Sequence, residues 1–155
     1  MSSKTNGGME NRIAHYQDLE PIDYASFIKN YKPDGAQGYA LIGRAGKTAP
    51  AIEGEHGFTM AVNKVSPGKG APLHSHPKPE VFVVLSGQCK FFWGEKGENE
   101  ATLGLWDTIS FPAHTREGFL NVGDEETVLL VVLSGSEIGE VTFSSSKSTE
   151  QEARV

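Results

Sequence analysis

Cysteine is almost absent from this chain, with Cys89 the only one in 155 residues. A single thiol cannot close an intramolecular disulfide, and nothing in the composition requires an oxidising compartment. A chain of this length buries about two-thirds of its surface on folding, so one domain can be stable without covalent cross-links. We therefore expect a single domain that folds with its thiol reduced.

Long apolar runs and clusters of positive charge are also missing. The longest apolar runs, "VFVVL" and "VLLVVL", are far shorter than the roughly 20 residues that span a bilayer. The first residues, "MSSKTNGGMENR", lack the apolar core of a secretory signal. The formal net charge is −6, and no Lys/Arg patch suited to phosphates is present. These features predict a soluble cytoplasmic protein with no nucleic-acid or membrane partner.

Long amphipathic helices are the third absence. From residue 37 to residue 143, short β-prone runs alternate with Gly, Pro, Asn and Asp, which favours an all-β sandwich or small barrel. Residues 1–36 are expected to form a tail with a short helical or irregular segment, in which "DYASFIKNY" is a helix capped by Asp23. Residues 144–155 are polar and predicted to be a flexible tail.

What is present is a histidine-rich stretch, "GKGAPLHSHPKPEVFVVLSG". If this stretch is extended, His74 and His76 point to the same face, about 6.6 Å apart. The two prolines before Glu80 cannot donate to a β-ladder and indicate a bulge or corner that could bring the carboxylate towards the histidines. Two imidazoles and one carboxylate converging from one side suit Fe(II) and related ions. A solvent-facing polar loop is the alternative interpretation.

Gly68, His74, His76, Glu80 and Gly87 fit every fixed position of the pattern G-x5-H-x-H-x3-E-x6-G. In this the chain resembles the first motif of the cupin superfamily, and in size it is similar to small single-domain, quercetinase-like cupins. The resemblance implies a double-stranded β-helix (jelly-roll) barrel, commonly dimeric. It also implies that the two histidines and Glu80 bind a divalent transition metal (Fe, Mn, Ni, Zn or Cu).

The second cupin motif, G-x5-P-x-G-x2-H-x3-N, aligns with "WDTISFPAHTREGFLN" less completely. Pro112 and Asn121 fit, but Trp106 and His114 replace the two glycines and Glu117 replaces the ligand histidine. We expect Glu117 to be the fourth ligand, because carboxylates coordinate the same metals. His114 is the alternative, and a metal held by the first motif alone is a third option. If Glu117 is not a ligand, it can act as a general base.

Strand phase and aromatic content suggest the walls of a substrate pocket. We expect the lining to include Phe82, Phe91, Trp93, Trp106, His114 and Phe119. Core packing is the ordinary alternative for the aromatic rings. Such walls favour a small substrate that is aromatic or otherwise largely apolar.

Three functions fit these observations. The first is a metal-dependent dioxygenase acting on a small, oxygen-bearing, apolar or aromatic substrate. The second is a non-redox metal-dependent isomerase, lyase or hydrolase. The third is a non-catalytic barrel that binds a small molecule or metal, an option that the altered second motif keeps open.

A homodimer is also expected. Both faces of "VFVVL" are apolar, so the outward face of that strand needs cover. Dimers are common in the family that the chain resembles, which also favours a homodimer.

Overall fold

The computed structural model describes residues 8–143, so the predicted C-terminal tail at 144–155 lies outside the described residues. No helix in the described range is long and apolar enough to cross a membrane. The predicted division into an N-terminal segment at 1–36, a barrel at 37–143 and a tail at 144–155 stays a prediction. The elements in chain order are η1 (Glu10–Arg12), η2 (Tyr16–Asp18), η3 (Tyr24–Ser26), β1 (Ala36–Ile42), β2 (Phe58–Val65), β3 (Gly70–Ser75), β4 (Glu80–Ser86), β5 (Cys89–Trp93), β6 (Asn99–Leu103), β7 (Thr108–Phe111), β8 (Glu117–Asn121), β9 (Thr127–Ser134) and β10 (Thr142–Phe143).

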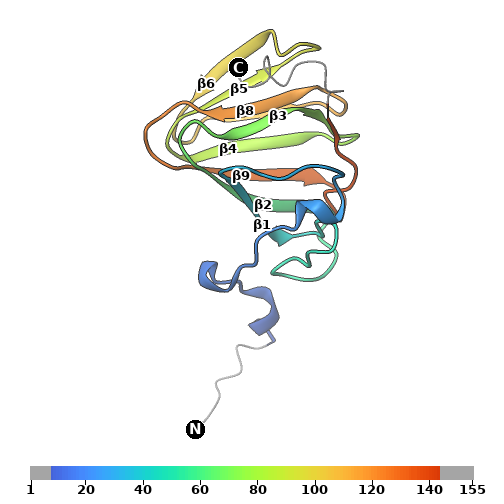
Figure 1. Cartoon of the computed structure of the whole chain (residues 1–155). Helices are drawn as coiled ribbons and strands as arrows, with labels where there is room; N and C mark the ends of the chain where they lie inside the picture. The colour runs from blue at the N-terminus through green and yellow to red at the C-terminus, as the bar shows by residue number, and fades with distance from the viewer. Residues whose placement is uncertain (1–7, 144–155) are drawn as a thin grey trace.

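The strands form two five-stranded antiparallel sheets. One sheet has the order β1-β2-β9-β4-β7 and the other has the order β10-β3-β8-β5-β6. Among the described strands, the chain changes sheet at every connection except those between β1 and β2 and between β5 and β6. This alternation is the jelly-roll arrangement, and Figure 1 shows the strands stacked along the barrel. The predicted all-β double-stranded β-helix is confirmed.

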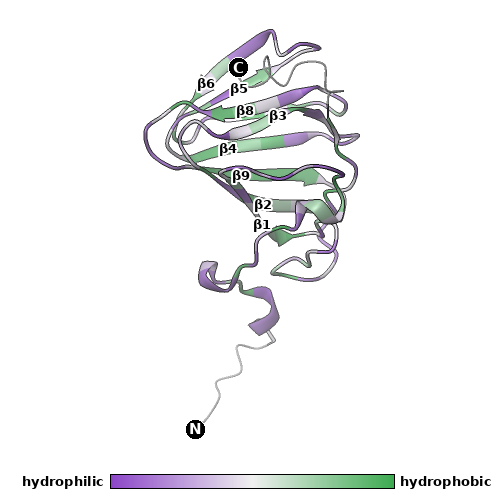
Figure 2. Ribbon diagram, in the orientation of Figure 1, coloured by the Kyte–Doolittle hydropathy of each residue, from purple (hydrophilic) through white to green (hydrophobic). Residues whose placement is uncertain are grey.

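The apolar strands fill the space between the sheets because their side chains alternate faces. Along β9, Leu129, Val131 and Leu133 are buried while their neighbours are only half-buried. Figure 2 shows the apolar residues gathered in the strands and the polar ones in η1 and η2. Across the two sheets, the Phe82 ring lies 5.2 Å from Phe91 and 5.7 Å from Phe119, centroid to centroid. This aromatic group forms the middle of the core.

The predicted helix in "DYASFIKNY" is reduced to the three-residue η3. Asp23 makes no side-chain cap; instead its backbone N–H donates to Thr48 Oγ1. The segment follows the barrel edge, where the Ile22 N–H donates to the Gly38 carbonyl at 2.9 Å. A Cβ on Gly38 would lie 2.1 Å from the Tyr24 hydroxyl, so this glycine makes room for the tyrosine. Packing on the barrel therefore prevails over helix propensity here.

Candidate metal centre

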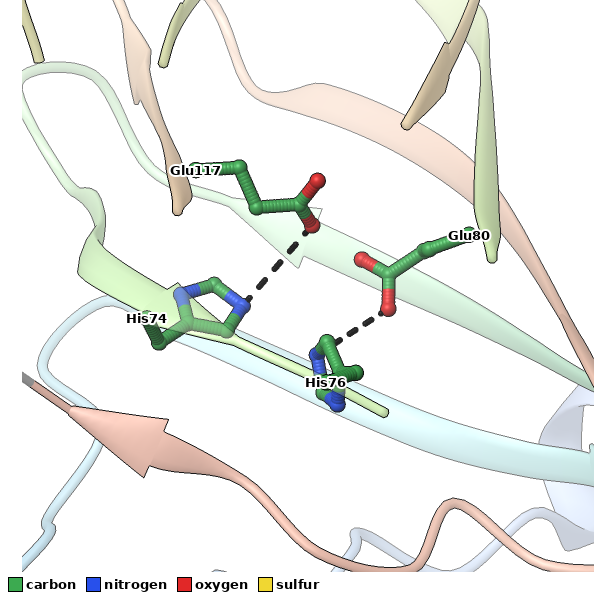
Figure 3. A group of neighbouring side chains, drawn as sticks. All are labelled: His74, His76, Glu80 and Glu117. Atoms are coloured by element: carbon green, nitrogen blue, oxygen red, sulfur yellow. Dashed lines mark ion pairs between the residues drawn. The ribbon is translucent and has the colours of Figure 1, made fainter. Parts of the chain in front are cut away.

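Four side chains converge between the two sheets (Figure 3). His74 lies near the end of β3, and His76 follows that strand. Glu80 is the first residue of β4, and Glu117 is the first residue of β8. The β3–β8 register places Glu117 directly opposite His74. One sheet therefore supplies His74 and Glu117, the other supplies Glu80, and the connection between them supplies His76.

The structure confirms the corner that the two prolines before Glu80 predict. The chain leaves one sheet after Ser75 and enters the other at Glu80, so the two prolines fall in the corner. Proline has no N–H to donate to a ladder, which suits it to a place where pairing stops. The corner turns Glu80 back towards the histidines.

The four groups are close together and removed from water. One potential ligand atom from each residue lies within 4.8 Å of the others. The exposed fractions are 7% for His74, 7% for His76, 4% for Glu80 and 2% for Glu117. His76 Nε2 is 3.1 Å from a Glu80 oxygen, and His74 Nε2 is 4.0 Å from a Glu117 oxygen. The spacing matches a set of donors around one ion.

A backbone contact orients the His74 ring. Its Nδ1 lies 2.8 Å from the Pro72 carbonyl, which can only accept a hydrogen bond. Nδ1 therefore carries the proton, and the lone pair is on Nε2, the atom that faces the carboxylates. Contacts of this kind commonly orient metal-binding histidines.

Glu117 shows why a cation fits this site. Both of its carboxylate oxygens are buried and have no hydrogen-bond partner of normal geometry among the described residues, although the Glu80 carboxyl and the His74 ring lie beside them. His76 Nδ1 also lacks a partner of normal geometry in that range, although the Glu140 backbone lies beside it. Buried polar groups are costly when unpaired, and buried charges are normally paired or bound to metals. Two imidazoles and two carboxylates are ordinary ligands for a divalent transition metal, so the residues present fit such an ion.

The electrostatics of the protein alone also favour a bound cation. Burial raises the pKa of Glu117, and the nearby Glu80 raises it further. Burial likewise raises the pKa of Glu80, to about 7. Burial lowers the pKa of His74 and lowers that of His76 to about 3, so both imidazoles are neutral near pH 7. Neutral imidazoles and a repelling carboxylate pair provide the electron density that a cation requires.

His114, the alternative fourth ligand, lies outside this cluster of described residues. Its side chain is exposed, and its backbone N–H donates to the His76 carbonyl at 2.7 Å. Its φ of 68° places it in a left-handed turn before β8. The geometry thus brings Glu117, rather than His114, to the first-motif residues.

A cavity of about 90 Å³ is lined by three of the four donors, His74, His76 and Glu80, whereas Glu117 is not among its described lining residues. Of the predicted wall residues, Phe82 and Phe119 line it. Phe91 is fully buried behind them, and Trp93 packs against Phe111 with centroids 6.1 Å apart. Neither Phe91 nor Trp93 is among the described lining residues, because their strand places them in the core.

Trp106 and His114 also differ from the prediction that they line the pocket. Trp106 is 71% exposed in the turn between β6 and β7, and His114 is exposed before β8. Neither is among the described residues that line the cavity. Both lie in turns that carry the chain outside the barrel, so strand alternation did not apply to them.

Sequence reasoning missed several lining residues of the cavity. Tyr24 and Tyr31 come from the N-terminal segment outside the sheets, Phe143 from β10 and Asn63 from β2. Tyr31 stacks on Phe143 at 4.9 Å, and Phe143 lies 5.4 Å from His74. The three- and four-residue spacing of the apolar side chains in "DYASFIKNY" was the available signal, since such a face needs a surface to cover.

Asn121, which fits the second motif, has a structural role. Its Nδ2 donates to the Val65 and Glu125 carbonyls at 2.9 and 2.7 Å. Its Oδ1 accepts the Gly123 N–H at 2.9 Å, and its side chain is only 1% exposed. The amide therefore fixes the turn after β8 and takes no part in the donor set.

Comparison with known proteins agrees with this architecture. Residues 61–133 match the family described as the cupin domain. Sequence and fold together support the cupin superfamily. The chain is also 27% identical over 125 residues to auxin-binding protein 1 of Arabidopsis thaliana. That match covers 74% of this chain and 62% of the relative, so the chain spans less than two-thirds of that protein.

Solved cupin-fold structures cover more of the chain. The polyketide cyclase RemF from Streptomyces resistomycificus has a TM-score of 0.66 at 19% identity, over 92% of this chain and 89% of that one. Oxalate decarboxylase from Bacillus subtilis has a TM-score of 0.62 at 20% identity, over 82% of this chain and 30% of that one. Identities this low show a shared fold only, and the quercetinase-like subtype stays a prediction.

Proposed function

We propose that this cupin is a metal-dependent dioxygenase, similar to quercetinase-like enzymes, that acts on a small, oxygen-bearing, apolar or aromatic substrate. One observation carries the proposal: four buried donors meet in one cluster, and three of them, His74, His76 and Glu80, line a cavity whose other walls are mostly apolar. Polar ligands grouped in an otherwise apolar pocket are the usual arrangement of a small-molecule site.

His74, His76, Glu80 and Glu117 would hold the metal. When bound, a redox-active divalent ion supplies electron transfer to oxygen and Lewis acidity towards an oxygen-bearing substrate. The protein orients His74 through the Pro72 carbonyl and keeps the four donors away from water. If Glu117 does not bind the metal, its carboxylate is instead the candidate general base for a substrate proton.

Phe82 and Phe119 form the apolar floor against which a substrate would pack. The cavity volume of about 90 Å³ is smaller than the 150 Å³ apolar cavity that accepts benzene. A ring-sized substrate therefore requires a wall to move. Tyr24 and Tyr31 belong to a segment outside the two sheets, so we expect that wall to move outward.

Metal analysis and oxygen uptake test the proposal. Protein purified without chelators should contain close to one transition-metal ion per chain and should consume oxygen with one or more members of a panel of phenols and enols. The metal-free protein and a His74→Ala/His76→Ala variant are the controls. Metal uptake with product formation but no oxygen consumption would replace the dioxygenase with a non-redox enzyme. A site that takes up no metal would contradict both.

We also propose that two copies pair through the outward face of the first sheet. Val81 lies opposite Val132, and Val83 lies opposite Leu130, on that face of β4 and β9. All four are half-buried in the single chain, so a partner would complete their burial. Light scattering should give a dimer, and Val83→Glu should give a monomer that still binds metal. A monomeric wild-type protein would contradict this arrangement.

A further inference from the structure

The cavity walls offer neutral hydrogen-bonding groups and no positive charge. The polar members beyond the donor set are the hydroxyls of Tyr24 and Tyr31 and the amide of Asn63. Among the described residues, no Lys or Arg lines the cavity. A hydroxyl or carbonyl on a substrate would find partners here, while a carboxylate or phosphate would find no side-chain cation.

The cations close in sequence to the donors do not line the cavity. Lys78, in the corner between β3 and β4, donates from Nζ to the Glu137 carbonyl at 2.5 Å, and its charge is the least of the causes that lower the pKa of His76, after burial and His74. Arg116 precedes Glu117, but its Nη1 lies 3.4 Å from a Glu95 oxygen. Neither side chain is among the described lining residues.

The donor set itself adds a second, independent contribution. A divalent ion with three histidines and one glutamate, as the two motifs specify, has a net charge of +1. With Glu117 in place of the motif's third histidine, two carboxylates offset the ion and the net charge is zero. Because Glu117 replaces the histidine of the motif, the metal centre attracts an anion less strongly than a centre with three histidines would.

We propose that Glu117, as a ligand of a metal beside a cavity whose described lining holds no Lys or Arg, is a specificity-determining residue that restricts the site to substrates which enter uncharged. This inference rests on the metal-binding part of the proposed function. The substrate class is then a neutral phenol, enol or hydroxyketone, and carboxylates and phosphates are disfavoured. An anion entering this site would lose its hydration without gaining a compensating charge, which is unfavourable in a buried pocket.

Calorimetry on the zinc-loaded protein tests this without any oxygen chemistry. Benzamide and benzoate have one shape and differ by one charge; acetamide and acetate are the smaller pair. We expect the wild-type protein to bind the amide of a pair at least about tenfold more tightly than the carboxylate. Glu117→Gln removes the charge at similar size, and Glu117→His restores the motif residue. Either should reduce the amide preference by about tenfold or more.

Zinc content measured on each variant provides the control, so that only proteins with a filled site are compared. A carboxylate that binds the wild-type protein as tightly as its amide would overturn the proposal. The proposal would also be overturned if both zinc-loaded variants kept the amide preference of the wild-type protein. It would be overturned as well if the wild-type protein bound neither member of either pair. Because zinc supports no redox chemistry, failure of oxygen uptake leaves this result intact. Conversely, oxygen uptake with an anionic substrate would support the proposed oxygenase activity and contradict the selection for uncharged substrates.

Discussion

Each of the two cupin motifs has two fixed glycine positions, and in this chain all four have positive φ although only the first motif keeps its glycines. In the first, Gly68 and Gly87 both have φ of +75°, a left-handed conformation that glycine adopts without strain. In the second, Trp106 and His114 stand at the glycine positions and keep φ of +70° and +68°. The backbone conformation is therefore retained although the residues suited to it are gone.

Each of the two second-motif residues is the third residue of a hydrogen-bonded turn. The Asp107 N–H donates to the Gly104 carbonyl around Trp106, and the Thr115 N–H donates to the Pro112 carbonyl around His114. A type II turn requires positive φ at that position, which is why glycine is usual there. The comparison suggests that the barrel sets the turn geometry, while the residues in the second motif have changed.

Metal affinity gives the largest expected effect in this comparison. His76→Ala in the first motif and Glu117→Ala in the second should each lower metal affinity by about 100-fold or more, because each removes a donor from a buried site. His114→Ala should change it less than about threefold, since that side chain is exposed. Competition with a chelator measures all three. A greater loss in His114→Ala than in Glu117→Ala would show that the second motif binds metal in another conformation.

Alanine substitutions at two first-motif glycines distinguish the cost of backbone strain from the cost of a steric clash. Gly68→Ala should destabilise the fold by about 1 kcal/mol through its positive φ alone, because no atom lies within 4 Å of the added Cβ. Gly87→Ala should cost about 2 kcal/mol or more, because its Cβ would also lie 2.6 Å from Thr127 Oγ1. Denaturant unfolding measures both. Equal losses would show that the Thr127 side chain yields without cost.

The first motif contributes Glu80 and the second contributes Glu117, and their proximity predicts a pH dependence. Burial raises both pKa values, and Glu80 raises that of Glu117 further, so the folded metal-free protein holds more protons on this pair than the unfolded chain. The unfolded histidines titrate at the ordinary value of 6.5, so both histidines are largely neutral in the folded and unfolded states only above about pH 7.5. Stability of the metal-free protein should then fall as pH rises from about 7.5 to 8.5, by up to about 1.4 kcal/mol per pH unit for each extra proton held.

Glu117→Gln is the matched control for that pH dependence. It removes one carboxyl and the repulsion, so the slope of unfolding free energy against pH should become shallower. Zinc binding should flatten the slope in the wild-type protein, since metal replaces the proton. A wild-type slope that is flat without metal would mean that water reaches the pair and that the carboxylates are both ionised.

Several features could be predicted from sequence because they depend on local spacing. The pattern of short β-prone runs indicated the barrel, and the spacing of His74, His76 and Glu80 indicated a shared site. Glu117 could be aligned, but only the β3–β8 register shows it opposite His74. The wall formed by Tyr24 and Tyr31 depends on how a segment outside the sheets crosses the barrel, which no local period encodes. A cytoplasmic location stays a prediction.

The smallest expected effect concerns Trp106, whose side chain is 71% exposed and contributes little packing. Trp106→Ala removes the indole but keeps a Cβ at positive φ, whereas Trp106→Gly removes both. The glycine variant should be more stable than the alanine variant by about 0.5–1 kcal/mol, because relief of left-handed strain outweighs the extra flexibility of the unfolded chain. Thermal and denaturant unfolding of the pair measure this difference. Alanine proving equal or better would mean that the turn changes conformation when the tryptophan is removed.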